Sequence, residues 1–525
     1  MGNNVFNTNN RTDNSIKTSF WGVLRSVVEI LLAFVYRTIF IKVLGADYLG
    51  LNGLFTNILQ VLSLAELGVT TAIVFRFYKP ISDNNFIRVG KLMNYLKKVY
   101  IYIAIFILVV GLLISPFIKF FISDTSIVPA DINLYFIYIL YLINTVSSYL
   151  FVYKQSILSA DQRGYIISLF GILMSLIKYV VQIILLLFYK NYTATLFAGI
   201  LISVIFNFLF SFWTEKKYKF VFNVKEELSK EDKTEIFNDT KAVMFHKVGA
   251  TVKLSTDSII LSKYVSLVSA GIYSNYSMII SGLQTIIGML LGNFVSSVGN
   301  AHVKLSKEDN YNIYKKLLFI NFWISTVVIV CSYLLINDFI NLWIGPDFLF
   351  DRFTLIMLCV QFYIFISRQI NISYTNGCGL FTKDRYRPII EAVLNLIISI
   401  IGVKILGIVG VFIGTVISSI ATVFWREPVI LYKEEFKKPV YKYWLLYFKF
   451  AVFSIFLCFS GDYIKSRYLT IDSILSLVIE AIVCFVFVNL LLVLLYHKKE
   501  EYAYMKQLFK KIINKISKKN YTYIK

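Results

Sequence analysis

Charged residues and prolines are scarce in this sequence. Of its 525 residues only 16% are charged and only 7 are proline, whereas 57% are hydrophobic. A soluble chain of this length needs more charged surface. Proline interrupts helices, so its scarcity favours long continuous ones. The apolar runs also lack the period-two alternation of β-barrel strands. The composition therefore excludes a soluble domain and predicts an all-α polytopic membrane protein.

Side chains that carry catalysis or bind metals are also few. The chain has 5 cysteines and 3 histidines, and their spacing matches no metal site or disulfide framework. No G-x-x-x-x-G-K-[ST] phosphate loop or D-x-D pair occurs, and no Ser/His/Asp set is recognisable. We therefore expect no catalytic residue, no metal and no cofactor, and we predict that the protein is not an enzyme.

Apolar segments long enough to cross a bilayer recur along the whole chain. A spanning helix needs roughly 20 mainly apolar residues. Such segments lie near 20–43, 51–75, 97–121, 132–153, 165–189, 193–214, 241–262, 269–298, 314–336, 352–374, 388–407, 409–432, 443–461 and 473–496. The sequence thus predicts about fourteen transmembrane helices.

The distribution of positive charge supports this count. Lys383, Arg385 and Arg387 lie between the tenth and eleventh predicted helices, whereas the loops 44–50 and 122–131 on the opposite side hold no Lys or Arg. Cytoplasmic loops of membrane proteins are enriched in Lys and Arg, so the basic side is predicted to be cytoplasmic. Both chain ends lie on that side. The formal net charge of +22 is then explained by basic cytoplasmic loops and not by nucleic-acid binding, so we expect no nucleic-acid partner.

The predicted helices fall into groups separated by polar segments. The expected order is a disordered tail at 1–19, six helices at 20–214, a cytoplasmic linker at 215–240, six helices at 241–432, helices 13 and 14 at 443–496, and a basic tail at 497–525.

The two groups of six share a repeated motif. The pattern L-x-x-x-G-[LI]-[FY]-[TS]-N occurs at 49–57 and at 267–275, and N-x-x-K-K occurs at the same offset at 94–98 and 312–316. A slightly larger offset aligns Asp161 with Asp384. Six is an even number, so both groups insert in the same orientation, related by an axis along the membrane normal. Two pseudo-symmetric bundles of this kind are typical of a transporter.

Three segments resemble signatures of a known family. They are 65–69 (Ala-Glu-Leu-Gly-Val), 160–163 (Ala-Asp-Gln-Arg) and 256–261 (Thr-Asp-Ser-Ile-Ile-Leu). They resemble the Wzx-type flippases for O-antigen, capsule and teichoic acid, of the multidrug/oligosaccharidyl-lipid/polysaccharide (MOP) exporter superfamily. The resemblance implies a MATE- and MurJ-like fold in a bacterial cell membrane. It also implies an undecaprenyl-diphosphate-linked oligosaccharide as cargo, and membrane lipids and a polysaccharide polymerase as partners.

Several charged residues lie deep inside predicted spans, where an uncompensated charge is costly. Arg25 and Glu29 share a face of the first helix at i, i+4, and Lys253 and Asp257 do so on the seventh. In the implied fold these helices line the central cavity, where cations would replace the counterions of a diphosphate. The hypothesis assigns head-group binding to Arg25, Arg37, Lys178, Lys247, Lys253 and Arg368, and charge coupling to Glu29, Glu66 and Asp257. The alternative is that the two pairs are structural.

Two other functions stay open. A cation-coupled drug or small-molecule exporter of the MATE type would share the fold, with twelve helices and a cavity biased toward carboxylates. A membrane glycan polymerase or ligase would need a large external loop, and the longest predicted one, near 337–351, is short. We therefore expect a flippase that works by alternating access.

Overall fold

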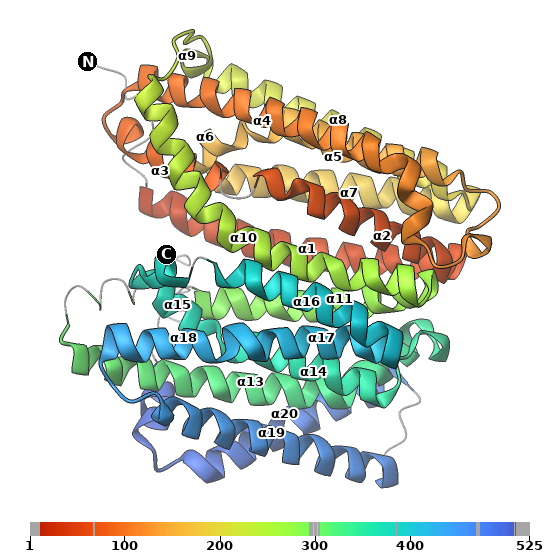
Figure 1. Cartoon of the computed structure of the whole chain (residues 1–525), viewed down its shortest axis with the longest axis vertical. Helices are drawn as coiled ribbons and strands as arrows, with labels where there is room; N and C mark the ends of the chain where they lie inside the picture. Colours follow the sequence, from red (N-terminus) through yellow and green to blue (C-terminus); the bar gives the residue numbers. More distant parts are fainter. Residues whose placement is uncertain are drawn as a thin grey trace, which may run out of the picture. The chain divides into compact units, whose positions relative to one another are not determined.

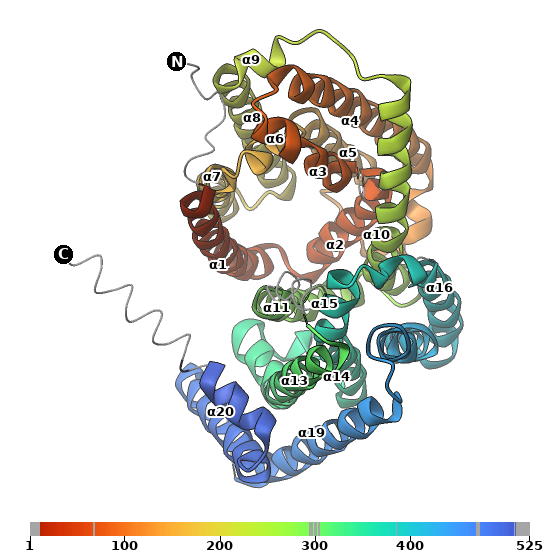
Figure 2. The ribbon, with the colours of Figure 1, turned by 90° about the vertical axis from the view of Figure 1, so that its left-hand side faces the viewer.

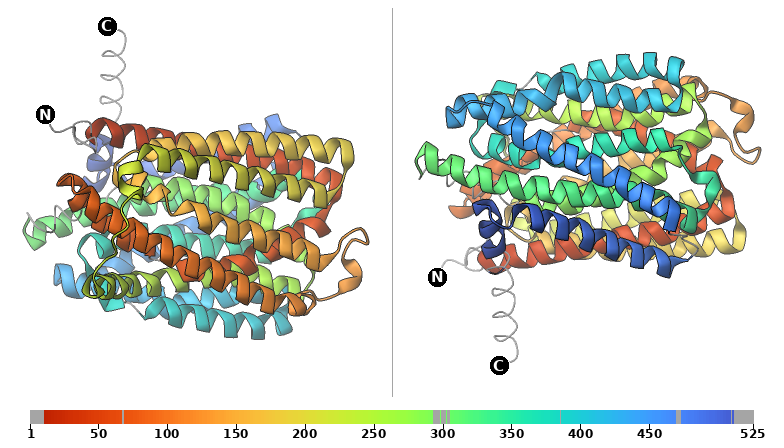
Figure 3. Two further views of the ribbon diagram at one scale, coloured as in Figure 1. Left: turned by 90° about the horizontal axis from the view of Figure 1, so that it is seen from above. Right: turned by 90° about the horizontal axis from the view of Figure 1, so that it is seen from below.

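The computed structural model describes residues 11–66, 69–292, 298, 302, 305–384, 386–468, 473–508 and 510; at some of these, including 241–254, it describes the backbone alone. The described residues are almost entirely helical and none lies in a β-strand, which confirms the predicted all-α class. They form two compact units: Met1–Asn275 with Pro388–Val411, and Tyr276–Arg387 with Phe412–Lys525. Within each unit the long helices run roughly alongside one another (Figure 1 and Figure 3).

The first unit contains most of the N-terminal helices. They are α1 (Arg11–Leu44), α2 (Ala46–Leu62), η1 (Ser63–Glu66), α3 (Val69–Ser82), α4 (Phe86–Ile114), η2 (Ser115–Phe121), η3 (Thr125–Ile127), α5 (Leu134–Val152), α6 (Gln155–Ala160), α7 (Gly164–Tyr189), α8 (Tyr192–Lys217), α9 (Lys219–Phe222) and α10 (Lys230–Tyr264). Helix α16 (Arg387–Leu406) joins them from much later in the sequence.

The second unit contains the C-terminal helices. They are α13 (Lys307–Ile344), η4 (Pro346–Phe348), α14 (Arg352–Ser367), α15 (Gln369–Gly377), η5 (Leu380–Asp384), η6 (Ile420–Phe424), α18 (Trp425–Ile430), η7 (Leu431–Phe436), α19 (Tyr441–Tyr468) and α20 (Ile474–Tyr496). Helices α11 (Leu267–Gly292) and α17 (Ile408–Ser419) run from the first unit into the second. The predicted division into bundles at 20–214 and 241–432 stays a prediction, because units defined by packing need not coincide with sequence repeats.

Ten helical segments of the described chain are long and apolar enough to cross a membrane. They are Phe86–Phe121, Leu134–Val152, Gly164–Tyr189, Tyr192–Lys217, Lys307–Ile344, Arg352–Gly377, Arg387–Leu406, Ile408–Phe436, Tyr441–Arg467 and Ile474–Tyr496. Each overlaps a predicted span. The remaining four predicted spans overlap α1, α2 with α3, α10 and α11, which are not among these ten segments. Residues 67–68 and 293–297 of those predicted spans lie outside the described residues. The chain is a multi-pass membrane protein.

Polar residues between the apolar runs determine where many helices begin. The side chains of Asn85, Asn133 and Asn191 accept hydrogen bonds from backbone N–H groups in the first turns of α4, α5 and α8. Ser229 and Ser306 do the same for α10 and α13. These caps satisfy donors that have no partner within the helix.

Helices α2 and α11 come very close together within the first unit. A Cβ atom added at Gly50 would lie 2.2 Å from the backbone oxygen of Leu267, and one added at Gly271 would lie 2.8 Å from that of Ala46. Glycine is required where two helix backbones approach this closely. Gly50 lies in the first copy of the repeated motif, and Leu267 and Gly271 lie in the second. The two copies of the motif therefore contact each other.

Helix α13 forms the centre of the second unit, and α14, α19 and α20 pack around it (Figure 2). Phe322 of α13 and Phe450 of α19 are fully buried, with ring centres 5.8 Å apart. Phe450 also stacks on Tyr496 of α20 at 5.1 Å. Since no hydrophobic effect drives helices together inside lipid, such close packing is a main source of stability there. The helices predicted as 13 and 14 are thus part of this core.

The hydrophilic segment predicted at 215–240 packs against α4 within the first unit. Arg88 on α4 donates to Asp232 at 2.7 Å, and Lys98 forms an ion pair with Glu227. Hydrogen bonds from Arg88 lower the pKa of Asp232. Hydrogen bonds from Lys98 and Lys233 lower the pKa of Glu227 to about 2. At neutral pH these carboxylates are therefore charged and attach the segment to α4.

Candidate functional site

A cavity of about 600 Å³ lies within the first unit. Its walls come from α1, α2 with η1, α5, α7 and α8, and Figure 2 shows these helices nearly end-on. The lining residues are Tyr36, Asn52, Thr56, Leu59, Gln60, Ser63, Tyr141, Asn144, Thr145, Lys178, Tyr179, Gln182, Tyr192, Leu196, Gly199 and Ile200. A space of this size falls within the range of small-ligand sites.

Most of the lining residues carry a hydroxyl or amide group. Tyr141 Oη donates to Asn52 Oδ1 at 2.7 Å and lies 3.2 Å from Tyr192 Oη. Gln182 Nε2 donates to the backbone oxygen of Thr195 at 3.1 Å, but its Oε1 is buried without a hydrogen-bond partner among the described residues. A buried acceptor left unsatisfied costs free energy until a donor reaches it. The cavity can therefore hydrogen-bond a ligand rich in hydroxyl groups.

Lys178 is the only charged residue among the described residues that line the cavity, so none of them is acidic. Its ammonium lies 5.8 Å from the centre of the Tyr179 ring, and Glu29 on α1 attracts it electrostatically. The sequence predicted Lys178 as a cargo-binding cation. The neutral polar residues around it were not predicted, because nothing distinguishes their side chains from other amides and hydroxyls in apolar spans.

Arg37 lies beside the cavity and joins α1 to α11. Its Nε donates to Asn275 Oδ1 at 2.7 Å, and its Nη2 donates to Ser274 Oγ. Both partners are neutral, so they bind the guanidinium without cancelling its charge. Ser274 and Asn275 are the last two residues of the repeated motif. The motif therefore marks this site as well as the repeat.

Arg25 and Glu29 form the predicted i, i+4 pair, with Nε and Oε1 2.8 Å apart. Ser175 Oγ lies 3.4 Å from the same carboxylate oxygen, and the Arg25 guanidinium packs over Gly171 of α7. Neither charged residue is among those that line the 600 Å³ cavity. The pair links α1 to α7, which supports the structural alternative for these two residues.

Glu66 and Asp257 are not among the residues that line this cavity. Glu66 accepts a hydrogen bond of 2.9 Å from Tyr100, and Asp257 is only 1% exposed. The side chains of Lys247 and Lys253 fall outside the described residues. The predicted pairing of Lys253 with Asp257 therefore stays a prediction.

Arg368 lies in the second unit and binds a buried carboxylate. It donates to the two oxygens of Glu427 at 2.9 and 2.6 Å, and Arg387 approaches the same carboxylate at 3.4 Å. Glu427 sits in α18, between the π-helical segments η6 and η7. Interruptions of this kind often occur at functional positions. The sequence predicted a role for this arginine but did not indicate its partner.

The two aspartates that the repeat aligned have similar surroundings. Asp161 is 5% exposed and pairs with Arg163 at 3.0 Å. Asp384 is 3% exposed and pairs with Arg387 and, at 2.7 Å, with Arg426. Each aspartate is thus a buried anchor held by an arginine close to it in the sequence.

An apolar groove of about 270 Å³ lies in the second unit between α13, α14, η6 and α19. Ile329, Val360, Ile420, Ala451 and Ile455 are among its lining residues, and no charged residue is among those described there. The groove can hold a hydrocarbon chain.

No family model and no curated protein matches the sequence. Solved structures do match the fold. The lipid II flippase MurJ in an inward closed conformation has a TM-score of 0.63 and 15% identity, over 90% of this chain and 99% of that chain. An inward-facing multidrug resistance MATE family transporter of the MOP superfamily has a TM-score of 0.61 and 13% identity, over 78% of this chain and 99% of that chain.

A third match is a MOP superfamily transporter from Pyrococcus furiosus, described as having a binding pocket of reverse polarity. Its TM-score is 0.50 and its identity 14%, over 82% of this chain and 97% of that chain. At such low identity these likenesses establish the fold alone. The chain has the fold of the MOP-superfamily transporters, as the sequence predicted.

Proposed function

We propose that the protein is a flippase that moves undecaprenyl-diphosphate-linked oligosaccharides across a bacterial cytoplasmic membrane for the synthesis of cell-surface polysaccharide. The observation that carries the proposal is the cavity in the first unit, whose described lining combines Lys178 with amides, hydroxyls and aromatic rings and has no carboxylate. A diphosphate-sugar head group is anionic and rich in hydroxyls, and this lining complements both properties.

Each part of the cargo has a matching feature. Lys178 attracts the diphosphate, and Arg37 beside the cavity adds a second positive charge. Gln182 and Asn52 supply hydrogen bonds to sugar hydroxyls. The polyprenyl tail is apolar and stays in the surrounding lipid. The head group then keeps hydrogen bonds and ionic contacts while it crosses the membrane, which avoids the cost of burying unpaired polar groups.

The transport cycle is alternating access, with the head group entering from the cytoplasm and leaving outside. A negative interior favours outward movement of an anion, so the membrane potential contributes to the direction of transport. A polysaccharide polymerase acting on the outer leaflet is the expected partner, because it consumes the flipped cargo.

A MATE-type exporter of small molecules is the second candidate, because MATE transporters share the fold. A cation-coupled exporter of cationic drugs needs an acidic group facing its cargo. The described lining of the cavity offers a lysine instead.

The test is transport by the full chain in liposomes, with a fluorescent undecaprenyl-diphosphate oligosaccharide as cargo. We expect Lys178→Gln to slow flipping by roughly 10- to 100-fold, as the loss of one charge-assisted hydrogen bond predicts. Lys178→Arg should retain most of the rate. Lys190→Gln, which removes an exposed lysine just beyond the same helix, is the matched control. Equal rates for Lys178→Gln and the control would refute the cationic site, and export of a cationic dye in place of the glycolipid would favour the MATE candidate.

A further inference from the structure

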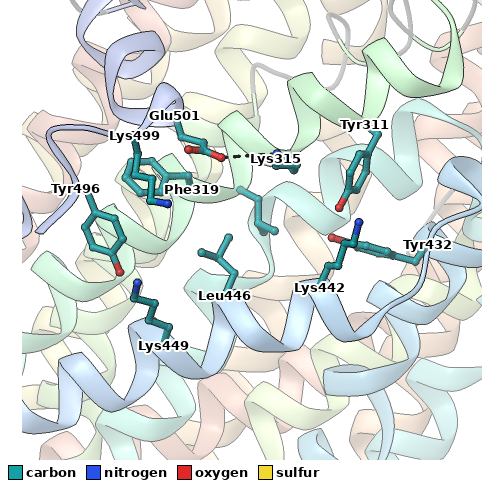
Figure 4. A pocket seen from close by; sticks show the side chains of 11 residues that line it. Tyr311, Lys315, Phe319, Tyr432, Lys442, Leu446, Lys449, Tyr496, Lys499 and Glu501 are labelled. Atoms are coloured by element: carbon teal, nitrogen blue, oxygen red, sulfur yellow. Dashed lines mark ion pairs between the residues drawn. The ribbon is translucent and has the colours of Figure 1, made fainter.

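A second cavity, of about 280 Å³, lies in the second unit between the start of α13, the start of α19 and the segment after α20. We call it the lysine pocket. Figure 4 shows side chains from these three segments converging on one space. The charged ones are Lys315 from α13, Lys442 and Lys449 from α19, and Lys499 and Glu501 from beyond α20.

Positive charge exceeds negative charge in the lysine pocket. Glu501 is the one acidic residue in the described lining, and its Oε1 lies 3.8 Å from Lys315 Nζ. Among the described residues Lys442, Lys449 and Lys499 have no carboxylate partner, although the Lys449 ammonium lies 5.1 Å from the centre of the Tyr496 ring. Like charges that line one pocket repel one another until an anion binds among them.

The lysine pocket lies at the ends of three candidate membrane spans. Lys315 and Lys449 are near the starts of two candidate spans, and Lys499 follows the end of a third. Beside it, Leu445 and Leu494 are 67% and 61% exposed, as expected for side chains that face acyl chains. The bias of basic residues assigns this end to the cytoplasmic leaflet, which carries anionic lipid.

We propose that the lysine pocket binds the phosphate of an anionic membrane lipid, such as phosphatidylglycerol, whose acyl chains lie against the exposed leucines of α19 and α20. Basic pockets between helices at this level suit such head groups. The ammonium groups make charge-assisted hydrogen bonds to the phosphate oxygens. A volume of about 280 Å³ fits a small head group better than an oligosaccharide. The inference does not rest on the proposed cargo.

The bound lipid would also hold residues 499–508, which follow α20, in place against the second unit. Residues 500–508 are helical, and Tyr502 stacks on Trp323 of α13 at 5.7 Å. Lys499 and Glu501 bring this segment to the edge of the lysine pocket. A phosphate held between Lys442, Lys449 and Lys499 would therefore tie the segment to α19.

The experiment measures binding to the full chain in neutral detergent. The probes are dioctanoyl-phosphatidylglycerol, dioctanoyl-phosphatidylcholine and inorganic phosphate. We expect the triple variant Lys442→Gln, Lys449→Gln and Lys499→Gln to bind phosphatidylglycerol roughly 100-fold more weakly, because each lysine near a membrane surface contributes roughly fivefold. The matched control replaces three exposed lysines outside the lysine pocket: Lys225→Gln, Lys307→Gln and Lys433→Gln. The control should bind as tightly as the original chain.

The outcomes separate the sources of the phosphate. Loss of phosphatidylglycerol binding in the triple variant but not in the control supports the proposal. Equal binding of phosphatidylcholine and phosphatidylglycerol overturns it, as does unchanged binding by the triple variant. If inorganic phosphate binds as tightly as the lipid, the lipid assignment is overturned in favour of a soluble phosphate. If the triple variant does not fold, Lys442→Gln alone should show a loss of roughly fivefold, and the triple arginine variant should bind normally.

Discussion

At the scale of single residues, Arg368 and Glu427 differ from the ion pairs at the protein surface. Their side chains are only 13% and 4% exposed. Lys383 and Glu434 form a pair of similar length, 2.7 Å, but are 52% and 28% exposed. When one partner of a buried pair is removed, the remaining charge has no water to stabilise it. The two pairs should therefore respond very differently to substitution.

We expect Arg368→Gln to lower the free energy of unfolding by about 3 kcal/mol, the low end for a broken buried pair, because Arg387 still lies 3.4 Å from Glu427. Lys383→Gln should lower it by no more than about 1 kcal/mol, because water and salt already screen that pair. Unfolding in mixed micelles monitored by tryptophan fluorescence measures both values. The double variant Arg368→Gln, Glu427→Gln should recover part of the loss. Equal effects of the two single variants would show that the buried pair is not structural.

The sequence identified the charged residues inside spans but not what compensates them. A charge in an apolar run requires compensation, and the sequence alone does not say of which kind. The structure shows three kinds: a carboxylate for Arg368, neutral side chains for Arg37, and a polar cavity for Lys178. The partners come from distant segments, so only the fold brings them together.

At the scale of helices, the contact of α2 with α11 depends on glycine. We expect Gly50→Ala to destabilise the protein by about 1–3 kcal/mol, because its Cβ would meet backbone atoms that cannot rotate away. Gly53→Ala on the same helix is the control, since its Cβ would lie 3.8 Å from the nearest atom. Thermal unfolding in detergent measures both. A control variant that melts as early as Gly50→Ala would refute the packing argument.

The segment around the start of α10 is held by two carboxylates, Glu227 and Asp232, whose pKa values are lowered in the folded protein. Their stabilising contribution is complete above about pH 4 and is lost as the pH falls below that value. A nitroxide label at the exposed Asn223 should therefore become more mobile between pH 4 and pH 2. Asp232→Asn should produce the same mobility at pH 7. An unchanged spectrum in acid would mean that other contacts hold the segment.

Hydropathy sufficed to place ten of the predicted spans on long apolar helices, because spanning segments need length and apolar side chains wherever they occur. It did not predict the π-helical turns on either side of Glu427, which depend on tertiary contacts. Nor did it predict that Tyr502 and Met505 after α20 pack into the second unit. Their spacing suited a helix lying on the membrane equally well.

At the scale of the whole molecule, neither compact unit is continuous in sequence. The first unit includes α16. Asn395 of α16 accepts a hydrogen bond from Thr256 of α10, and Ser399 donates one to the backbone oxygen of Val411. We expect a fragment of residues 1–275 to be unstable alone and to be rescued by co-expression of 276–525. Size-exclusion chromatography of the fragment with and without its complement checks this. A monodisperse fragment 1–275 with the melting temperature of the full chain would contradict it.

The glycine contact also bears on how such a chain arose. The segment 46–50 meets 267–271, whose equivalent in the first repeat is 49–53, so the contact joins stretches that overlap in the two repeats. Contacts between overlapping stretches of two copies are what joins identical subunits about a twofold axis. A half-length ancestor would have formed a dimer through this contact, and gene fusion would have kept the dimer interface within one polypeptide.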